Sequence, residues 1–220
     1  MKPLSKYEIH TKASVWLWAI WFFGVLPSIA QESENSVDQT ILIFGDSLTA
    51  GYGVDYDQAY PNILQSLLKA DGLPFEVIPS GVSGETTAGG LRRIDWVMRK
   101  PVDIFVLALG GNDGLRGIDL EDTKRNLIGI AKRVKTKSPN VRIVIAGMQI
   151  PPNLGERYTS SFADLYPEVA DELEAVLLPF LLKGVGGDPA LNQSDGIHPN
   201  REGHKRVAQH VYESLKPILN

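Results

Sequence analysis

The feature that most constrains the fold is a series of five short, continuous apolar runs spread along the chain. Each run has the length of a strand, and its apolar residues stand at consecutive rather than alternating positions. That pattern is typical of strands covered on both faces, as in a parallel sheet. The predicted strands are Thr40–Phe44, Phe75–Ile78, Ile104–Leu109, Val141–Ala146 and Ala175–Leu178.

Helical patterns lie between and after these runs. One helix is expected to begin near Asp119 and to end at Ser138-Pro139-Asn140. A second covers residues 162–173, and the last includes residues 207–215, with Pro199 expected in its first turn. Strand–helix alternation predicts an α/β fold, a three-layer α/β/α sandwich with a mostly parallel five-stranded sheet.

Composition narrows the classes of function. The 220 residues are 43% hydrophobic, which is enough to build one sizeable core. The formal net charge of −4 argues against a nucleic-acid-binding protein, which normally presents a basic face. The chain has no cysteine, which excludes disulfides, a cysteine nucleophile and a thiolate metal site.

The first thirty residues differ in composition from the rest. Three lysines precede the uncharged apolar stretch Ala13–Leu26, and Pro27-Ser28-Ile29-Ala30 follows it. This layout predicts a signal peptide over 1–30, cleaved after Ala30, and then one domain over 31–220 in the periplasm or outside the cell. The alternative is a membrane anchor over 13–30, although its apolar core is short beside the roughly 20 residues of a spanning helix. After cleavage we expect no stable membrane insertion.

Three glycine-rich segments follow the carboxyl ends of predicted strands. They are residues 45–51 (GDSLTAG), 80–90 (SGVSGETTAGG) and 110–114 (GGNDG). Ligands bind at this edge of open α/β sheets, so the three segments mark a candidate site.

A serine, a histidine and an aspartate in this chain suggest nucleophilic catalysis. Ser47 follows the first strand, and Asp195-Gly-Ile-His198 stands near the other end of the chain. A serine hydroxyl needs a base to take its proton, and the imidazole that serves as base needs an acceptor on its other nitrogen. Alone, Ser47 would be read as a helix N-cap. A metal site at Asp195, His198 and His204 is the weaker alternative, because no further ligands complete it. We expect His204 and His210 at the surface.

Four blocks in order resemble those of the SGNH (GDSL) hydrolases, in the bacterial branch of thioesterase I, lysophospholipase L1 and arylesterase. They are GDSLTAGYG at 45–53, VSGETTAGG at 82–90, GGND at 110–113 and DGIHPN at 195–200. The resemblance extends over residues 40–218 and implies a flavodoxin-like fold. Carried over by position, it makes Ser47 the nucleophile, His198 the base and Asp195 the acid. It also makes Ser47, Gly84 and Asn112 the oxyanion hole.

The chain departs from its relatives just before Gly84. Relatives often have an asparagine in this segment, where the chain reads Val77-Ile-Pro79-Ser-Gly-Val-Ser-Gly84. Pro79 has no backbone N–H to donate, so the hydrogen bonding of the loop must differ there. We expect Asp46 and Asp113 to brace loops and Ser83 to be an ordinary loop residue.

Together these features predict a cofactor-free, metal-free serine esterase acting on a small-molecule ester or thioester, among which a lysophospholipid is one candidate. An acetyl esterase acting on decorated saccharides is the alternative, and a non-catalytic acyl-binding protein is the alternative of another class. We expect a monomer and no nucleic-acid partner. Apolar residues near the proposed site are candidates for an acyl groove, with packing beneath the loops as the equal alternative; they are Leu115, Ile118, Met148, Ile150, Pro151 and Pro152.

Overall fold

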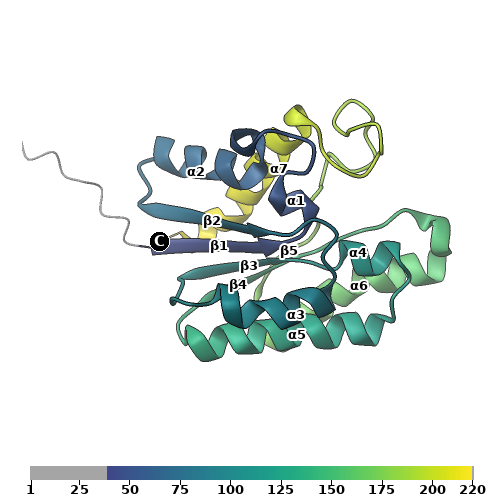
Figure 1. Ribbon diagram of the computed structural model, residues 1–220, viewed down its shortest axis with the longest axis horizontal. Coiled ribbons are helices and arrows are strands. Elements are labelled where there is room, and N and C mark those ends of the chain that lie inside the picture. Colours follow the sequence, from purple (N-terminus) through teal and green to yellow (C-terminus); the bar gives the residue numbers. More distant parts are fainter. Residues whose placement is uncertain (1–38, 220) are drawn as a thin grey trace, which may run out of the picture. The chain divides into compact units, whose positions relative to one another are not determined.

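Figure 1 shows the computed structural model of the chain, in which residues 39–219 are described. The predicted signal peptide over 1–30 and its cleavage site at Ala30 lie outside the described residues. Within residues 39–219, no helix has both the length and the apolar character needed to cross a membrane.

A five-stranded sheet forms the centre of the fold, and each strand coincides with one of the predicted apolar runs. The strands pair in the order β2-β1-β3-β4-β5, and every pairing among them is parallel. Their bounds are β1 (Gln39–Gly45), β2 (Phe75–Gly81), β3 (Ile104–Ala108), β4 (Arg142–Ala146) and β5 (Val176–Leu178).

The edge strand β2 continues three residues beyond its predicted end, through Pro79 to Gly81. Pro79 lies opposite Ile43 of β1. An edge strand tolerates proline because the missing N–H can belong to the side without a neighbouring strand. The departure from the family pattern at Pro79 therefore leaves β2 intact.

Helices cover both faces of the sheet (Figure 1). One face carries α2 (Tyr60–Ala70) and α7 (Arg201–Leu215), and the other carries α3 (Thr87–Val97), α5 (Leu120–Lys137) and α6 (Glu156–Leu173). The predicted α/β/α sandwich is thereby confirmed. The remaining elements are short: α1 (Ser47–Ala50), α4 (Gly111–Leu115) and the 3₁₀ turns η1 (Tyr56–Gln58), η2 (Pro152–Leu154) and η3 (Lys216–Ile218).

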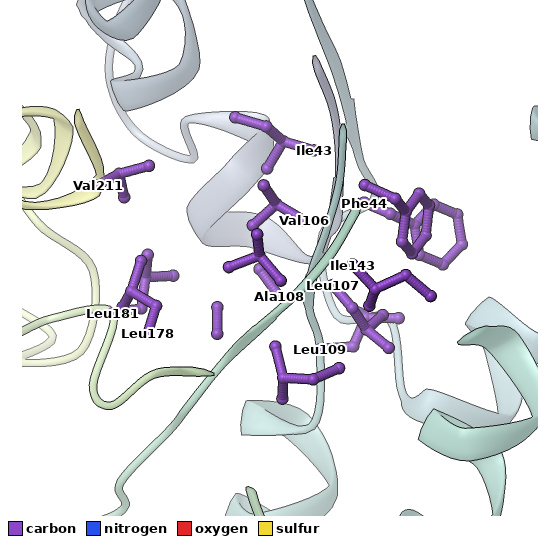
Figure 2. Close-up of a cluster of buried hydrophobic side chains, with 14 of the residues drawn as sticks. Ile43, Phe44, Val106, Leu107, Ala108, Leu109, Ile143, Leu178, Leu181 and Val211 are labelled. Carbon is purple, nitrogen blue, oxygen red and sulfur yellow. The ribbon is translucent and has the colours of Figure 1, made fainter. Parts of the chain in front are cut away.

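The core has two halves because successive residues of a strand point to opposite faces of the sheet. Figure 2 shows Ile43 and Val106 on the side where Val211 of α7 lies, and Phe44 and Leu107 on the other. All five side chains are buried. Burial on both faces accounts for the continuous apolar runs in the sequence.

Two expectations about the last helix are wrong. Pro199 precedes α7 instead of standing in its first turn, because Asn200 caps the helix by accepting from the N–H groups of Glu202 and Gly203. His204 is only 1% exposed and packs beneath the surface, whereas His210 is half-buried. The imidazole of His204 is held inside by the backbone N–H of Tyr60, which donates to its Nδ1 over 3.2 Å.

Strand order places the glycine-rich segments beside one another. β1 lies between β2 and β3, and all three strands run toward the edge where α1 and α4 begin (Figure 1). The segments after β1, β2 and β3 carry Ser47, Gly84 and Asn112, respectively. In a parallel α/β sheet, the point where the chain leaves a central strand in two directions is the usual ligand site.

Candidate active site

Ser47 lies at the carboxyl end of β1, as the first residue of the one-turn helix α1. The end of β2 passes close to the backbone of α1. A Cβ on Gly81 would lie 2.3 Å from the backbone nitrogen of Ala50, so only glycine allows this approach. Ser47 is 8% exposed.

The imidazole of His198 connects Ser47 to Asp195. Its Nε2 lies 2.9 Å from the Ser47 hydroxyl, and its Nδ1 lies 2.7 Å from Oδ2 of Asp195. The chain folds back locally because the other carboxylate oxygen, Oδ1, accepts from the backbone N–H groups of Ile197 and His198, at 2.9 and 3.0 Å. A single turn therefore presents both the carboxylate and the imidazole.

The ionisation of Asp195 fixes the tautomer of His198. Partial burial of Asp195 raises the pKa of its carboxyl, but the backbone and imidazole hydrogen bonds outweigh it and lower the pKa to about 2. An ionised carboxylate only accepts hydrogen bonds, so the neutral imidazole carries its proton on Nδ1. The lone pair of Nε2 is then available to the proton of the Ser47 hydroxyl.

The loop after β2 is braced around Gly84. Arg93 of α3 binds Glu85 in an ion pair and donates to the Ser80 hydroxyl over 2.8 Å. Gly84 itself has a φ of +77°, a left-handed conformation that L-residues with a side chain rarely adopt. A Cβ there would meet only Arg116, at 3.7 Å, so the backbone conformation and not lack of space requires glycine.

Asn112 is the second residue of α4, and its side chain points back toward α1. Its Nδ2 donates to Oδ2 of Asp46 over 3.2 Å. A side-chain amide nitrogen carries two hydrogens, so this bond leaves the second for another acceptor.

The next residue, Asp113, anchors α4 in the molecule. Its buried carboxylate accepts from both the backbone N–H and the hydroxyl of Thr87, at the start of α3. Asp46 and Asp113 therefore both brace loops, as predicted.

Two residues at the site were missed by the sequence reasoning. The ring of Tyr52 packs against the imidazole of His198, with 4.6 Å between ring centroids. The side-chain amide of Gln193 donates to the backbone oxygen of Tyr52, and its backbone N–H donates to that of His198, both over 2.7 Å. Tyr52 stands between the two glycines of GYG, and an aromatic residue in a glycine-rich segment was the available signal.

Within residues 39–219, no group of three or more histidine or acidic side chains could hold a metal ion. What the arrangement offers instead is a hydroxyl, an imidazole oriented by a carboxylate, and nearby N–H donors. These are the parts that acyl transfer through a serine requires.

Comparison with known proteins identifies the family. The GDSL-like lipase/acylhydrolase family matches residues 43–206. The chain belongs to this family. It is accordingly a hydrolase of the GDSL, or SGNH, type, and the predicted family resemblance is confirmed.

Several GDSL relatives are similar over almost their whole length. Esterase TesA of Pseudomonas aeruginosa is 38% identical over 189 residues, which are 85% of this chain and 92% of TesA. Thioesterase 1/protease 1/lysophospholipase L1 of Escherichia coli K12 is 36% identical over 201 residues, 91% of this chain and 94% of that protein. The crystal structure of the esterase EstA from Pseudoalteromonas, inhibited by monoethylphosphonate, superposes with a TM-score of 0.79 at 32% identity, covering 83% of this chain and 100% of EstA.

The predicted acyl-groove residues of this GDSL hydrolase fall into two groups. Leu115, Pro151 and Pro152 are exposed, and Ile118 is half-buried. Met148 and Ile150 are buried in the core, where they pack beneath α4. The position of these two fits the packing alternative, and contact of any of the six with substrate remains a prediction.

Proposed function

We propose that the chain is a serine esterase that hydrolyses carboxylic esters or thioesters through Ser47, His198 and Asp195. The hydrogen-bonded series from Ser47 through His198 to Asp195 is the observation that carries this proposal. The names of the relatives, which include an esterase and a thioesterase, support the same class of reaction.

In the acylation step, Nε2 of His198 accepts the hydroxyl proton while Oγ of Ser47 attacks the acyl carbonyl carbon. The imidazolium that forms is stabilised by the carboxylate of Asp195. The developing oxyanion accepts hydrogen bonds from the backbone N–H groups of Ser47 and Gly84 and from Nδ2 of Asn112. When the intermediate collapses, His198 returns the proton to the leaving alcohol or thiol.

The acyl-enzyme is then hydrolysed by the same groups. His198 takes a proton from water, which attacks the acyl carbonyl, and returns it to Oγ of Ser47 as the acid departs. Tyr52 supports both steps because its ring packs on the imidazole and limits the orientations of His198.

Exposed apolar side chains favour substrates with an apolar acyl or aryl group. Nearly all of the large ones described lie in segments at the loop edge of the sheet, and one, Trp96, stands apart on α3. Apolar residues gathered on one rim of a soluble chain are typical of a binding surface. Those on the rim are Tyr52, Tyr56, Val82, Leu115, Leu154 and Ile197.

A series of p-nitrophenyl esters tests both the mechanism and the substrate class. We expect Ser47→Ala to lose about 10⁴-fold or more in kcat while keeping the fold. In the wild type, kcat/KM should rise from acetyl to octanoyl by well over about tenfold, because each buried methylene contributes roughly 0.8 kcal/mol. Turnover by folded Ser47→Ala would contradict the mechanism.

Leu115→Asp and a matched control, Trp96→Asp, locate the acyl surface. Both replace an exposed apolar side chain by a carboxylate, and only Leu115 lies on the rim. Leu115→Asp should flatten the chain-length series while sparing acetyl esters, and Trp96→Asp should leave the series unchanged. A maximum at the acetyl ester in the wild type would favour the saccharide deacetylase instead.

A further inference from the structure

The carboxylate of Asp46 joins the two short helices of the site. It is 2% exposed and accepts two hydrogen bonds, from the backbone N–H of Leu48 to Oδ1 over 3.1 Å and from Nδ2 of Asn112 to Oδ2 over 3.2 Å. The first bond caps α1, which begins with Ser47. The second reaches α4, whose Gly111 lies beside the carboxylate, since a Cβ there would be in ordinary van der Waals contact with Oδ2, at 3.4 Å.

We propose that Asp46 is a positioning residue that orients the side-chain amide of Asn112 so that an N–H of Nδ2 faces the oxyanion. This inference rests on the proposed function, because it assigns a purpose to Asp46 only if an oxyanion forms at Ser47.

The chemistry of the two side chains supports the inference. An asparagine amide can present either its oxygen or its nitrogen in a given direction, and only the nitrogen stabilises an oxyanion. A carboxylate accepts and never donates, so Asp46 selects the rotamer in which Nδ2 faces it. The amide is planar, so holding one hydrogen on Oδ2 also sets the direction of the other.

The burial of Asp46 indicates that its negative charge does not by itself stabilise the fold. Burial raises the pKa of its carboxyl to about 6, although the hydrogen bonds from Leu48 and Asn112 and the charge of His198 act in the opposite direction. The other titratable groups that interact with Asp46 are the buried phenols of Tyr60 and Tyr166, which are neutral. At neutral pH the protein thus keeps a charge where burial disfavours it.

Asp46→Asn reverses the selection with little change in shape. The oxygen of the introduced amide can still accept from Leu48, but its NH₂ group then faces Asn112, whose own amide must turn its oxygen toward that group. Because the amide of Asn112 has turned over, the lone pairs of its oxygen, instead of an N–H donor, then face the oxyanion. We expect kcat to fall by about 10- to 100-fold with KM within about twofold, while the melting temperature at pH 8 stays equal or rises.

A double-mutant cycle with Asn112→Ala decides whether Asp46 acts through Asn112. In the Asn112→Ala background, Asp46→Asn should cost less than about threefold in kcat, because the amide it orients is gone. The same factor in both backgrounds would overturn the inference and assign the effect to the cap of α1.

Two further variants complete the experiment. Asp46→Ser keeps a cap for Leu48 and frees the amide of Asn112, so it should lose less kcat than Asp46→Asn; an equal or larger loss would contradict the inference. Asp55→Asn, an exposed carboxylate nearby in sequence, should leave kcat unchanged. Activity that survives Ser47→Ala would refute the proposed function, an outcome distinct from an unchanged Asp46 effect across the cycle.

Discussion

At the scale of single residues, two buried ionisable groups near the site act on folding in opposite directions. Burial, followed by the charge of His198, lowers the pKa of His204 to about 4. Burial raises the pKa of Asp46 to about 6. As pH rises from about 4 to 6.5, His204 loses its proton mainly in the unfolded chain, which makes the folded state relatively more stable. Asp46 ionises mainly in the unfolded chain over about the same range, which makes the folded state relatively less stable.

The variant His204→Gln isolates the histidine contribution. Glutamine can still accept from the N–H of Tyr60 but does not titrate. Below pH 6.5, His204 binds a proton in the unfolded wild type but stays neutral in the folded state, so the wild type loses stability relative to the variant. Urea unfolding should show that the difference in free energy of unfolding between wild type and His204→Gln changes by about 3 kcal/mol between pH 7 and pH 4. A difference that is independent of pH would contradict the burial argument.

The sequence already placed His204 on the buried face of α7. It precedes Val207 by three residues and Val211 by seven, the same spacing that predicted the helix. As a polar residue type, histidine was expected at the surface, but the helical spacing of His204 from the apolar residues of α7 correctly predicts a buried position. Tyr60 supplies a donor for Nδ1 of this neutral imidazole, whereas Nε2 is buried without a hydrogen-bond partner among the described residues.

At the scale of elements, the site stands on two helices too short to leave a periodic signal. α1 has four residues and α4 has five, little more than one turn of 3.6 residues. Their presence could not be predicted from apolar spacing, whereas the longer α5 was predicted to begin near Asp119, the residue that caps it in the structure. The glycine-rich motifs indicated where the segments of α1 and α4 lie, but did not predict that these segments are helical.

Gly84 and Gly72 offer a matched pair for testing the loop after β2. Both have positive φ, +77° and +69°, and a Cβ at either has room. Alanine at either should cost roughly 1–2 kcal/mol of stability from backbone strain. Only Gly84→Ala should also lower kcat, by about tenfold or more, because it displaces an N–H at the oxyanion.

Gly72→Ala is the control, because Gly72 stands in the turn before β2, at the opposite end of that strand from Gly84. Esterase kinetics and chemical denaturation of the two purified variants make the comparison. Equal kcat in the two variants would remove Gly84 from the proposed oxyanion hole.

At the scale of the whole molecule, sheet order brings together segments that are distant in sequence. Ser47 and His198 are 151 residues apart, and their hydrogen bond depends on the path of every strand between them. No local pattern encodes such a contact. The apolar runs predicted the strands, and the family motifs indicated which residues would meet.

We propose that the enzyme acts after export. The lysines, apolar stretch and Ser28-Ile29-Ala30 of the first thirty residues support this proposal. Intact-mass measurement of protein from an envelope or culture fraction should give a chain that begins at Gln31. A mass that includes residues 1–30 would favour the membrane anchor.

Covalent labelling by a fluorophosphonate tests the central claim most directly, because the reagent phosphonylates a serine that a neighbouring base has activated. Peptide mapping by mass spectrometry should find one adduct, on Ser47, in the wild type. Ser47→Ala should give none, and His198→Ala should react far more slowly while remaining folded. Labelling of another serine, such as Ser83, or of none in the folded wild type, would contradict the assignment of Ser47 as the nucleophile.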